Sequence, residues 1–94
     1  MKGHSKQHIR CIFHGRVQGV GFRYTTLHVA GRYDVAGHVR NMPDGTVELV
    51  AEGAPGEIEK FIAEVEKRME RYISHKTVER SNQIAGLEGF DIAF

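Results

Sequence analysis

The sequence Gly-Arg-Val-Gln-Gly-Val-Gly-Phe-Arg at residues 15–23 carries the strongest signal for both fold and binding in this chain. It places three glycines within seven positions, and Arg23 follows at a point where a helix could begin. Glycines let a backbone curl until successive N–H groups converge, and a helix start adds free N–H groups and a partial positive charge. The planar guanidinium of Arg23 suits a phosphate-like oxyanion. The stretch therefore predicts an anion-binding loop between a strand and a helix.

A strand and a helix are predicted on the two sides of this loop. Apolar and polar residues alternate over 9–14, which is the strand period, and Gly15 ends that strand. Residues 22–32 place several apolar side chains on one helical face, although β-branched residues in this segment weaken a helix. Gly31 is a suitable helix terminator, so we predict a helix over this segment.

The middle of the chain predicts a β-hairpin followed by a second helix. Residues 35–41 and 46–52 both alternate in the strand period. Between them lies Met-Pro-Asp-Gly at 42–45, in which the proline fixes φ and Asp-Gly suits a tight tip. Glycines and a proline break the chain at 53–56, and residues 57–70 then carry apolar side chains on one face of an amphipathic helix.

Two further strand patterns lie near the end of the chain, a weaker one over 77–81 and the last over 90–94. With the last pattern as the fourth main strand and the other as a short addition, the order of elements is β-α-β-β-α-β. This order predicts an α+β, ferredoxin-like split βαβ fold, in which an antiparallel sheet carries two helices on one face. We expect its central strands to be 9–14 and 35–41, lying parallel, which brings Asn41 to the mouth of the glycine loop.

Length and charge limit what this chain can bind. At 94 residues it has room for one domain, and 13 Lys and Arg residues against 12 Asp and Glu residues give a net charge of +1. Duplex nucleic acid or an anionic membrane favours a much stronger basic bias, so we expect neither as a partner. Any anion that the loop holds is therefore expected to be small and held locally.

The sequence indicates a cytoplasmic protein. The single cysteine, Cys11, excludes an internal disulfide and is predicted to be a buried core residue. The first eight residues, MKGHSKQH, lack the apolar run of a signal peptide, and no segment approaches the roughly 18 apolar residues that span a bilayer. We expect residues 1–7 to be a flexible tail, residues 8–94 to be the folded domain, and the protein to be a monomer.

The spacing of the glycines and histidines excludes several familiar sites. No Gly-Lys-Ser/Thr follows the glycines, as a Walker-type phosphate loop requires, and the spacing G-x-x-x-G-x-G differs from a dinucleotide fingerprint. The six histidines form no compact metal-ligand pattern, and His4 and His8 lie in the polar N-terminal segment. The sequence also gives no argument for a Ser/His/Asp or Cys/His arrangement of the kind used in nucleophilic catalysis. We therefore expect no metal and no cofactor.

Two separated motifs resemble those of the acylphosphatase family. GRVQGVGFR at 15–23 is followed by GHVRNMPDG at 37–45, and the similarity continues through TVELVAEG at 46–53 to the terminal FDIAF, so that it covers residues 8–94. The resemblance implies the ferredoxin-like fold and hydrolysis of the carboxyl–phosphate bond of acyl phosphates without a metal. The implied partners are a small acyl phosphate as substrate and inorganic phosphate as product.

The resemblance also implies the roles of individual residues. Arg23 binds the substrate phosphate together with the loop backbone, and Asn41 positions the attacking water. The implied phosphate-binding loop consists of Gly15, Arg16, Val17, Gln18, Gly19, Val20, Gly21 and Phe22. This chain departs from the family at His38, where members commonly have an aromatic residue, and over 71–89, which match poorly. These departures bear on substrate preference and leave Arg23 and Asn41 unchanged.

Two alternative functions stay open from the sequence. QGVGFRYT at 18–25 faintly resembles the core of an RNA-recognition motif, although it lies between a strand and a helix and the net charge is only +1. The second alternative is a domain that binds a phosphate-bearing ligand, such as carbamoyl phosphate, within a larger maturation system. A chain of 94 residues favours a free hydrolase over that role.

Overall fold

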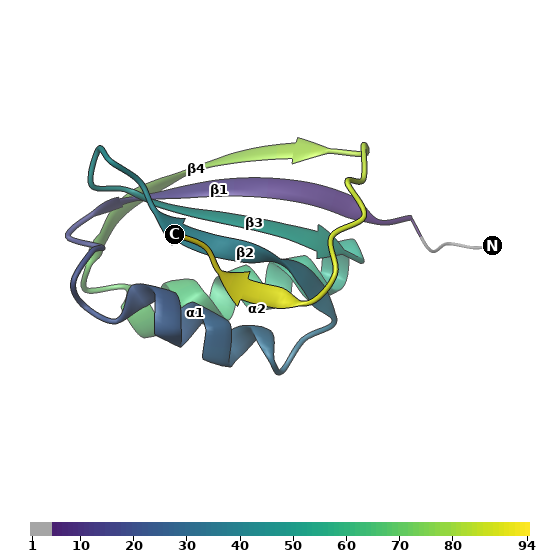
Figure 1. Cartoon of the computed structure of the whole chain (residues 1–94). Coiled ribbons are helices and arrows are strands. Elements are labelled where there is room, and N and C mark those ends of the chain that lie inside the picture. The colour runs from purple at the N-terminus through teal and green to yellow at the C-terminus, as the bar shows by residue number, and fades with distance from the viewer. Residues whose placement is uncertain (1–4) are drawn as a thin grey trace.

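Two helices cover one face of a five-stranded sheet in the computed structural model, which describes residues 5–94 (Figure 1). The elements are β1 (Gln7–Gly15), α1 (Phe22–Ala30), β2 (Val35–Asn41), β3 (Val47–Gly53), α2 (Pro55–Met69), β4 (Ile73–Ser81) and β5 (Phe90–Ile92). This arrangement confirms the predicted split βαβ fold and its hairpin of β2 and β3. The expected tail over 1–7 lies partly outside the described residues, and β1 begins at Gln7.

The strands lie in the order β4-β1-β3-β2-β5 across the sheet. β3 pairs antiparallel with both β1 and β2, so the expectation that β1 and β2 are the central pair was wrong. Every residue of β3 is buried, whereas β2 is half-exposed on one face, which makes β3 the better central strand. Phe13 and Asn41 both lie opposite Val47, so β1 and β2 still end at the same edge of the sheet. Asn41 therefore lies at the end where the glycine loop begins.

The last two strands differ most from their predicted counterparts. β4 spans Ile73–Ser81 and pairs with most of β1, so it is the fourth main strand, a place that the sequence pattern assigned to 90–94. β5 is a three-residue addition that runs parallel to β2, so the sheet is not antiparallel throughout. β4 is an edge strand whose residues are mostly exposed, and few of its positions need an apolar side chain. For that reason, its alternation is weak in the sequence.

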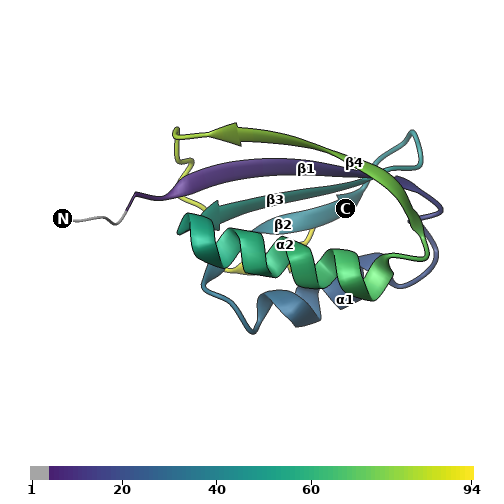
Figure 2. The ribbon, with the colours of Figure 1, turned by 180° about the vertical axis from the view of Figure 1, so that it is seen from behind.

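The hydrophobic core lies between the helices and the sheet (Figure 2). The buried face of α2 consists of Ile58, Phe61, Ile62, Val65 and Met69, as its amphipathic pattern predicts. Cys11 faces this core from β1 and is fully buried, which confirms its predicted place. Burial raises the pKa of its thiol to about 12, so the group stays protonated and unreactive near neutral pH.

The opposite face of the sheet carries a buried carboxylate held between two arginines. Glu48 is 4% exposed, and the Nε atoms of Arg10 and Arg40 each donate to one of its oxygens over 2.6 Å. Burial acts to raise the pKa of Glu48, but the two arginines outweigh it and hold that pKa below its ordinary value. The Nε2 atom of His38 lies 3.9 Å from the same carboxylate. Because alternate residues of a strand point to opposite faces, His38 points away from the face of β2 that carries Asn41.

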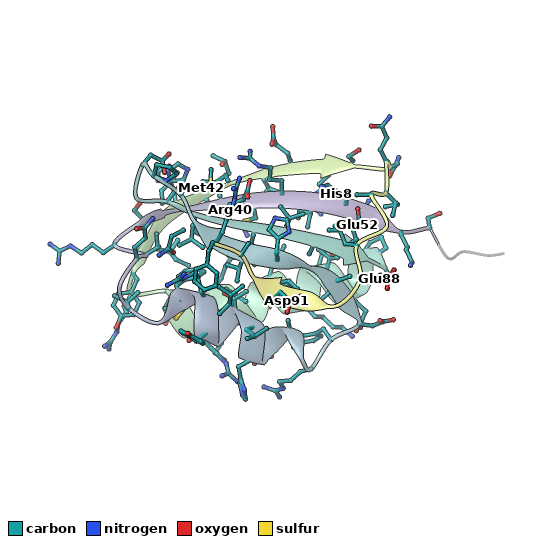
Figure 3. The ribbon with its side chains drawn as sticks, in the orientation of Figure 1. His8, Arg40, Met42, Glu52, Glu88 and Asp91 are labelled. Atoms are coloured by element: carbon teal, nitrogen blue, oxygen red, sulfur yellow. The ribbon has the colours of Figure 1, made fainter. Side chains whose placement is uncertain are left out.

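Glu52 on this open face holds the segment that joins β4 to β5 (Figure 3). Its carboxylate lies 2.6 Å from Nδ1 of His8. It also accepts hydrogen bonds from the backbone N–H groups of Ala85, Gly86 and Leu87. Burial opposes ionisation, but these hydrogen bonds outweigh it and lower the pKa of Glu52 to about 2. The held segment leads directly into β5 and so helps to fix the course of the C-terminal residues.

Candidate active site

The glycine loop leaves β1 at a glycine that the packing of β4 requires. A Cβ atom on Gly15 would lie 2.4 Å from the carbonyl oxygen of Tyr72 and 2.7 Å from the backbone nitrogen of Ser74. The next residue, Arg16, donates its backbone N–H to the same Tyr72 oxygen over 2.9 Å. The first two residues of the predicted loop thus attach it to the start of β4, and the N–H of Arg16 is already used within the protein.

Gly19 and Gly21 give the loop its shape. Their φ angles are 77° and 80°, a left-handed conformation that favours glycine, and a Cβ atom at either position would meet open space. Gly21 is the N-cap of α1, and no side chain caps the start of that helix. Within residues 5–94, the backbone N–H groups of 17–23 donate no hydrogen bond to the protein. A row of unused donors therefore leads into the positive end of a helix.

Three side chains of the loop serve to hold it in place. Val17 is fully buried and Phe22 is 2% exposed, and the Phe22 ring packs against Phe13 with ring centroids 5.0 Å apart. Gln18 donates from Nε2 to the carbonyl oxygens of Met42 and Thr46, at 2.8 and 2.9 Å. The loop is thus tied to the core on one side and to the β2–β3 turn on the other.

Arg23 and Asn41 lie in the wall of one small hollow at the mouth of this loop. The hollow has a volume of about 120 Å³, and its lining consists of Val17, Gly19, Gly21, Phe22, Arg23, Tyr24 and Asn41. The structure therefore brings together most of the residues that the sequence predicted for the site. Gly15, Arg16, Gln18 and Val20 do not line the hollow.

The side-chain oxygen of Asn41 is a buried acceptor that receives no hydrogen bond from residues 5–94. An unsatisfied buried acceptor costs roughly 1–3 kcal/mol, and it is retained where a bound molecule supplies the donor. A carboxamide can accept a hydrogen bond from a water molecule and donate one at the same time. Asn41 is therefore chemically suited to hold a water at the edge of the hollow.

Two aromatic residues next to Arg23 were not predicted as part of the site. Tyr24 lines the hollow, and the ring of Phe94 lies over the guanidinium of Arg23, with 5.4 Å from Cζ to the ring centroid. The motif FDIAF at the end of the chain marks Phe94 in the sequence, but only the pairing of β5 with β2 brings it here. His38, by contrast, points to the other face of the sheet beside Glu48 and does not line the hollow.

The hollow contains one permanent positive charge and no carboxylate in its wall. The acidic residue of the β2–β3 turn, Asp44, accepts hydrogen bonds from the hydroxyl and the backbone N–H of Thr46, which lower its pKa. Within residues 5–94, no group of three or more His, Cys, Asp or Glu side chains could hold a metal ion. Of the helices in this part of the chain, none has the length and apolar character needed to cross a membrane.

The split βαβ order and the sheet with two helices on one face define a domain of the ferredoxin-like class, in which Arg23 and Asn41 share one hollow at the glycine loop. The profile of the Acylphosphatase family matches residues 9–92, and the chain belongs to this family. An acylphosphatase from Listeria welshimeri is 42% identical over 82 residues, which cover 85% of this chain and 88% of the relative. An acylphosphatase from Bacillus velezensis is 40% identical over 84 residues, covering 88% of this chain and 93% of the relative.

Solved structures agree with this assignment. The acylphosphatase from Bacillus subtilis superposes with a TM-score of 0.85 at 33% identity, covering 94% of this chain and 99% of that one. Full-length HypF in a phosphate- and nucleotide-bound form superposes with a TM-score of 0.83 at 25% identity. That match covers 99% of this chain but only 12% of HypF. The same fold therefore occurs as a separate enzyme and as a small part of a larger protein.

Proposed function

We propose that this protein hydrolyses the carboxyl–phosphate bond of acyl phosphates to a carboxylate and inorganic phosphate, with Arg23 and Asn41 as its catalytic residues. The observation that carries the proposal is the shared hollow, whose lining combines loop residues that have unused N–H groups, Arg23, and an Asn41 oxygen without a partner in residues 5–94. Family membership over residues 9–92 supports the reaction class.

The phosphate group binds to the loop and to Arg23. Backbone N–H groups of 17–23 donate to its oxygens, and the helix start of α1 adds a partial positive charge. The guanidinium of Arg23 donates to two oxygens at once. These donors are fixed before the substrate arrives, so they stabilise the charge that moves onto the phosphoryl oxygens and the leaving oxygen in the transition state.

Asn41 holds the attacking water in line with the bond that breaks. The water oxygen forms a bond to phosphorus. The bond between phosphorus and the acyl oxygen breaks, and the carboxylate leaves with the electron pair of that bond. A carboxylate is a good leaving group, so positioning and charge stabilisation suffice without a strong general acid. The proton of the water goes to a phosphate oxygen, which agrees with the lack of a carboxylate in the wall of the hollow.

The finer properties of the protein follow from the same features. We propose a small acyl phosphate as the substrate, because the hollow is small and the net charge of +1 offers little to a nucleic acid. We also propose a cytoplasmic, monomeric protein, and the free, buried Cys11 is compatible with a reducing compartment.

HypF supplies the specific observation for a second candidate function. Its likeness to nearly the whole of this chain favours a role in which the domain binds a phosphate-bearing ligand for a larger system. The extensive identity to curated acylphosphatases favours the hydrolase. In the second role, the domain would bind carbamoyl phosphate but would leave benzoyl phosphate intact.

Decay of benzoyl phosphate in the presence of the protein, with and without EDTA, tests the proposal. We expect rapid decay that EDTA does not change, because the site that we describe uses no metal. A decay rate no faster than that of the buffer alone would contradict the proposal, and so would loss of the activity on adding EDTA.

A further inference from the structure

Two exposed aromatic side chains flank the hollow that holds the phosphate. Within residues 5–94, the exposed large hydrophobic residues are Tyr24, Ile84 and Phe94, at 67%, 39% and 98% exposure. Tyr24 lines the hollow and Phe94 lies over Arg23, whereas Ile84 belongs to the segment between β4 and β5. The most exposed apolar side chains of the described protein therefore lie beside the proposed reaction centre. A single exposed apolar residue is ordinary, but two exposed aromatic rings next to one hollow form a feature that a ligand can use.

The pairing of β5 with β2 positions Phe94 beside the hollow. β5 runs parallel to β2, with Phe90 opposite Gly37 and Ile92 opposite Val39. The backbone N–H of Ala93 donates to the carbonyl oxygen of Val39 over 2.9 Å, which extends the pairing by one residue. Continuing this register brings the last residue of the chain to the level of Asn41. Figure 1 shows the C terminus at the end of the sheet from which the glycine loop leaves.

The hollow is large enough for the phosphate group alone. Its volume of about 120 Å³ is well below the roughly 300–1,000 Å³ of pockets that enclose whole small molecules. A phosphate seated against the loop therefore leaves the acyl group outside, next to the side chains at the rim. Those rim side chains are the rings of Tyr24 and Phe94.

The contact between Phe94 and Arg23 is compatible with a bound phosphate. The Cζ atom of Arg23 lies over the Phe94 ring, 5.4 Å from its centroid, and the guanidinium carries five N–H donors. Because Phe94 is 98% exposed, its ring covers little of Arg23 and leaves donors for the anion. The substrate then has its phosphate on the donors of Arg23 and its acyl group within reach of the ring.

We propose that Phe94, together with Tyr24, forms the binding surface for the acyl group and makes the enzyme prefer aromatic acyl phosphates over acetyl phosphate. This inference rests on the proposed hydrolysis of acyl phosphates. An aromatic acyl group packs against the exposed rings and removes apolar surface from water, which a methyl group does to a much smaller extent. The preference is a property of the rim, so it is separable from phosphate binding in the hollow.

The test compares kcat/KM for benzoyl phosphate and for acetyl phosphate in the full chain, the Phe94→Ala variant and the Phe94→Leu variant. Phe94→Ala leaves the backbone unchanged and removes only the ring, so a change is assigned to the side chain. Ile84→Ala is the matched control, because it truncates an exposed apolar residue away from the hollow. The inhibition constant of inorganic phosphate is measured in parallel as a readout of the hollow alone.

We expect the benzoyl-to-acetyl ratio of kcat/KM to fall by about 3- to 10-fold in Phe94→Ala, which is the size of an aromatic contact. Phe94→Leu retains part of the ratio, and Ile84→Ala leaves it at the wild-type value. An unchanged ratio in Phe94→Ala, with the hydrolysis itself retained, would overturn this inference alone. An equal loss with both substrates and weaker phosphate inhibition would also overturn it, because the ring would then act only on Arg23. If the full chain hydrolyses neither substrate, the proposed function fails and this inference fails with it.

Discussion

The side chain of Gln18 fastens the glycine loop to the carbonyl oxygen of Met42, to which its Nε2 atom donates over 2.8 Å. The same amide donates to the carbonyl oxygen of Thr46 over 2.9 Å. Met42 follows Asn41 directly at the start of the β2–β3 turn, and Thr46 lies at the end of that turn. One side chain therefore fixes the position of the phosphate-binding loop relative to the residue that holds the water.

Gln18→Ala is expected to lower both activity and stability. The substitution removes two side-chain hydrogen bonds to the carbonyl oxygens of Met42 and Thr46, which keep their backbone donors within the turn. Because each lost bond contributes roughly 0.5–1.5 kcal/mol, the free energy of unfolding falls by about 1–3 kcal/mol. Because the loop then moves relative to Asn41, kcat for benzoyl phosphate falls as well. Urea unfolding and steady-state kinetics measure the two effects. Gln83→Ala, at an exposed glutamine, is the control and should match wild type. Wild-type kcat in Gln18→Ala would show that this tether does not position the site.

Asn41→Ala is expected to separate catalysis from phosphate binding. Loss of the carboxamide removes the group that orients the water, so kcat falls on the order of 10²–10³-fold. The inhibition constant of inorganic phosphate stays near its wild-type value, because the loop and Arg23 are intact. Asn82→Ala, at an exposed asparagine, serves as the control. A collapse of phosphate affinity in Asn41→Ala would instead make Asn41 a binding or structural residue.

Gly15→Ala is expected to destabilise the fold more than any change at an open glycine. The added Cβ meets the Tyr72 carbonyl at 2.4 Å, and the φ of 129° is strained for alanine. We expect the free energy of unfolding to fall by about 2–5 kcal/mol. Gly56→Ala in α2, where the Cβ meets open space, should change it by less than about 0.5 kcal/mol. Equal stability of the two variants in a thermal melt would contradict this account of the loop's attachment to β4.

Glu52 is expected to make stability sensitive to acid. Its pKa is lowered from an ordinary value of 4.5 to about 2, so its contribution is present above the unfolded pKa and is lost as pH falls through the folded one. The free energy of unfolding should therefore drop between about pH 4.5 and pH 2. Glu52→Gln is less stable at neutral pH and loses less over this window. Glu88→Gln, at an exposed carboxylate in the same segment, should follow wild type. Parallel pH profiles for Glu52→Gln and wild type in urea unfolding would contradict the role of Glu52.

The sequence predicts those parts of the fold whose periodicity is imposed by the core. β1 and β2 alternate clearly because one face of each is buried, and α2 shows its apolar face for the same reason. β3 alternates although it is buried throughout, since Glu48 and Glu52 on its outer face are covered by their hydrogen-bond partners. The full length of β4 was not predicted, because an exposed edge strand needs few apolar side chains and its alternation is weak. The order of strands in the sheet could not be derived from local patterns, since β3 takes the central place through pairings distant in sequence.

Two sequence motifs predicted most of the candidate site. The structure adds contacts of Arg16 and Phe94 that the sequence did not predict. Local chemistry identified the loop and Arg23, whereas the split βαβ plan and the second motif pointed to Asn41; Arg23, Asn41 and part of the loop line one hollow. The sequence could not reveal that the N–H of Arg16 is used by Tyr72, because that contact depends on the start of β4. The contact between Phe94 and Arg23 could not be predicted either, since it depends on the parallel pairing of the three-residue strand β5 with β2.

Hydrolysis of benzoyl phosphate by Arg23→Ala, measured with the inhibition constant of inorganic phosphate, tests the central claim most directly. Arg80→Ala, at an exposed arginine of β4, is the matched control for loss of one positive charge. We predict that kcat falls on the order of 10²–10³-fold or more in Arg23→Ala, with much weaker phosphate inhibition, while Arg80→Ala stays at the wild-type level. Near-wild-type turnover by Arg23→Ala would contradict the claim that this arginine binds the phosphate in the reaction.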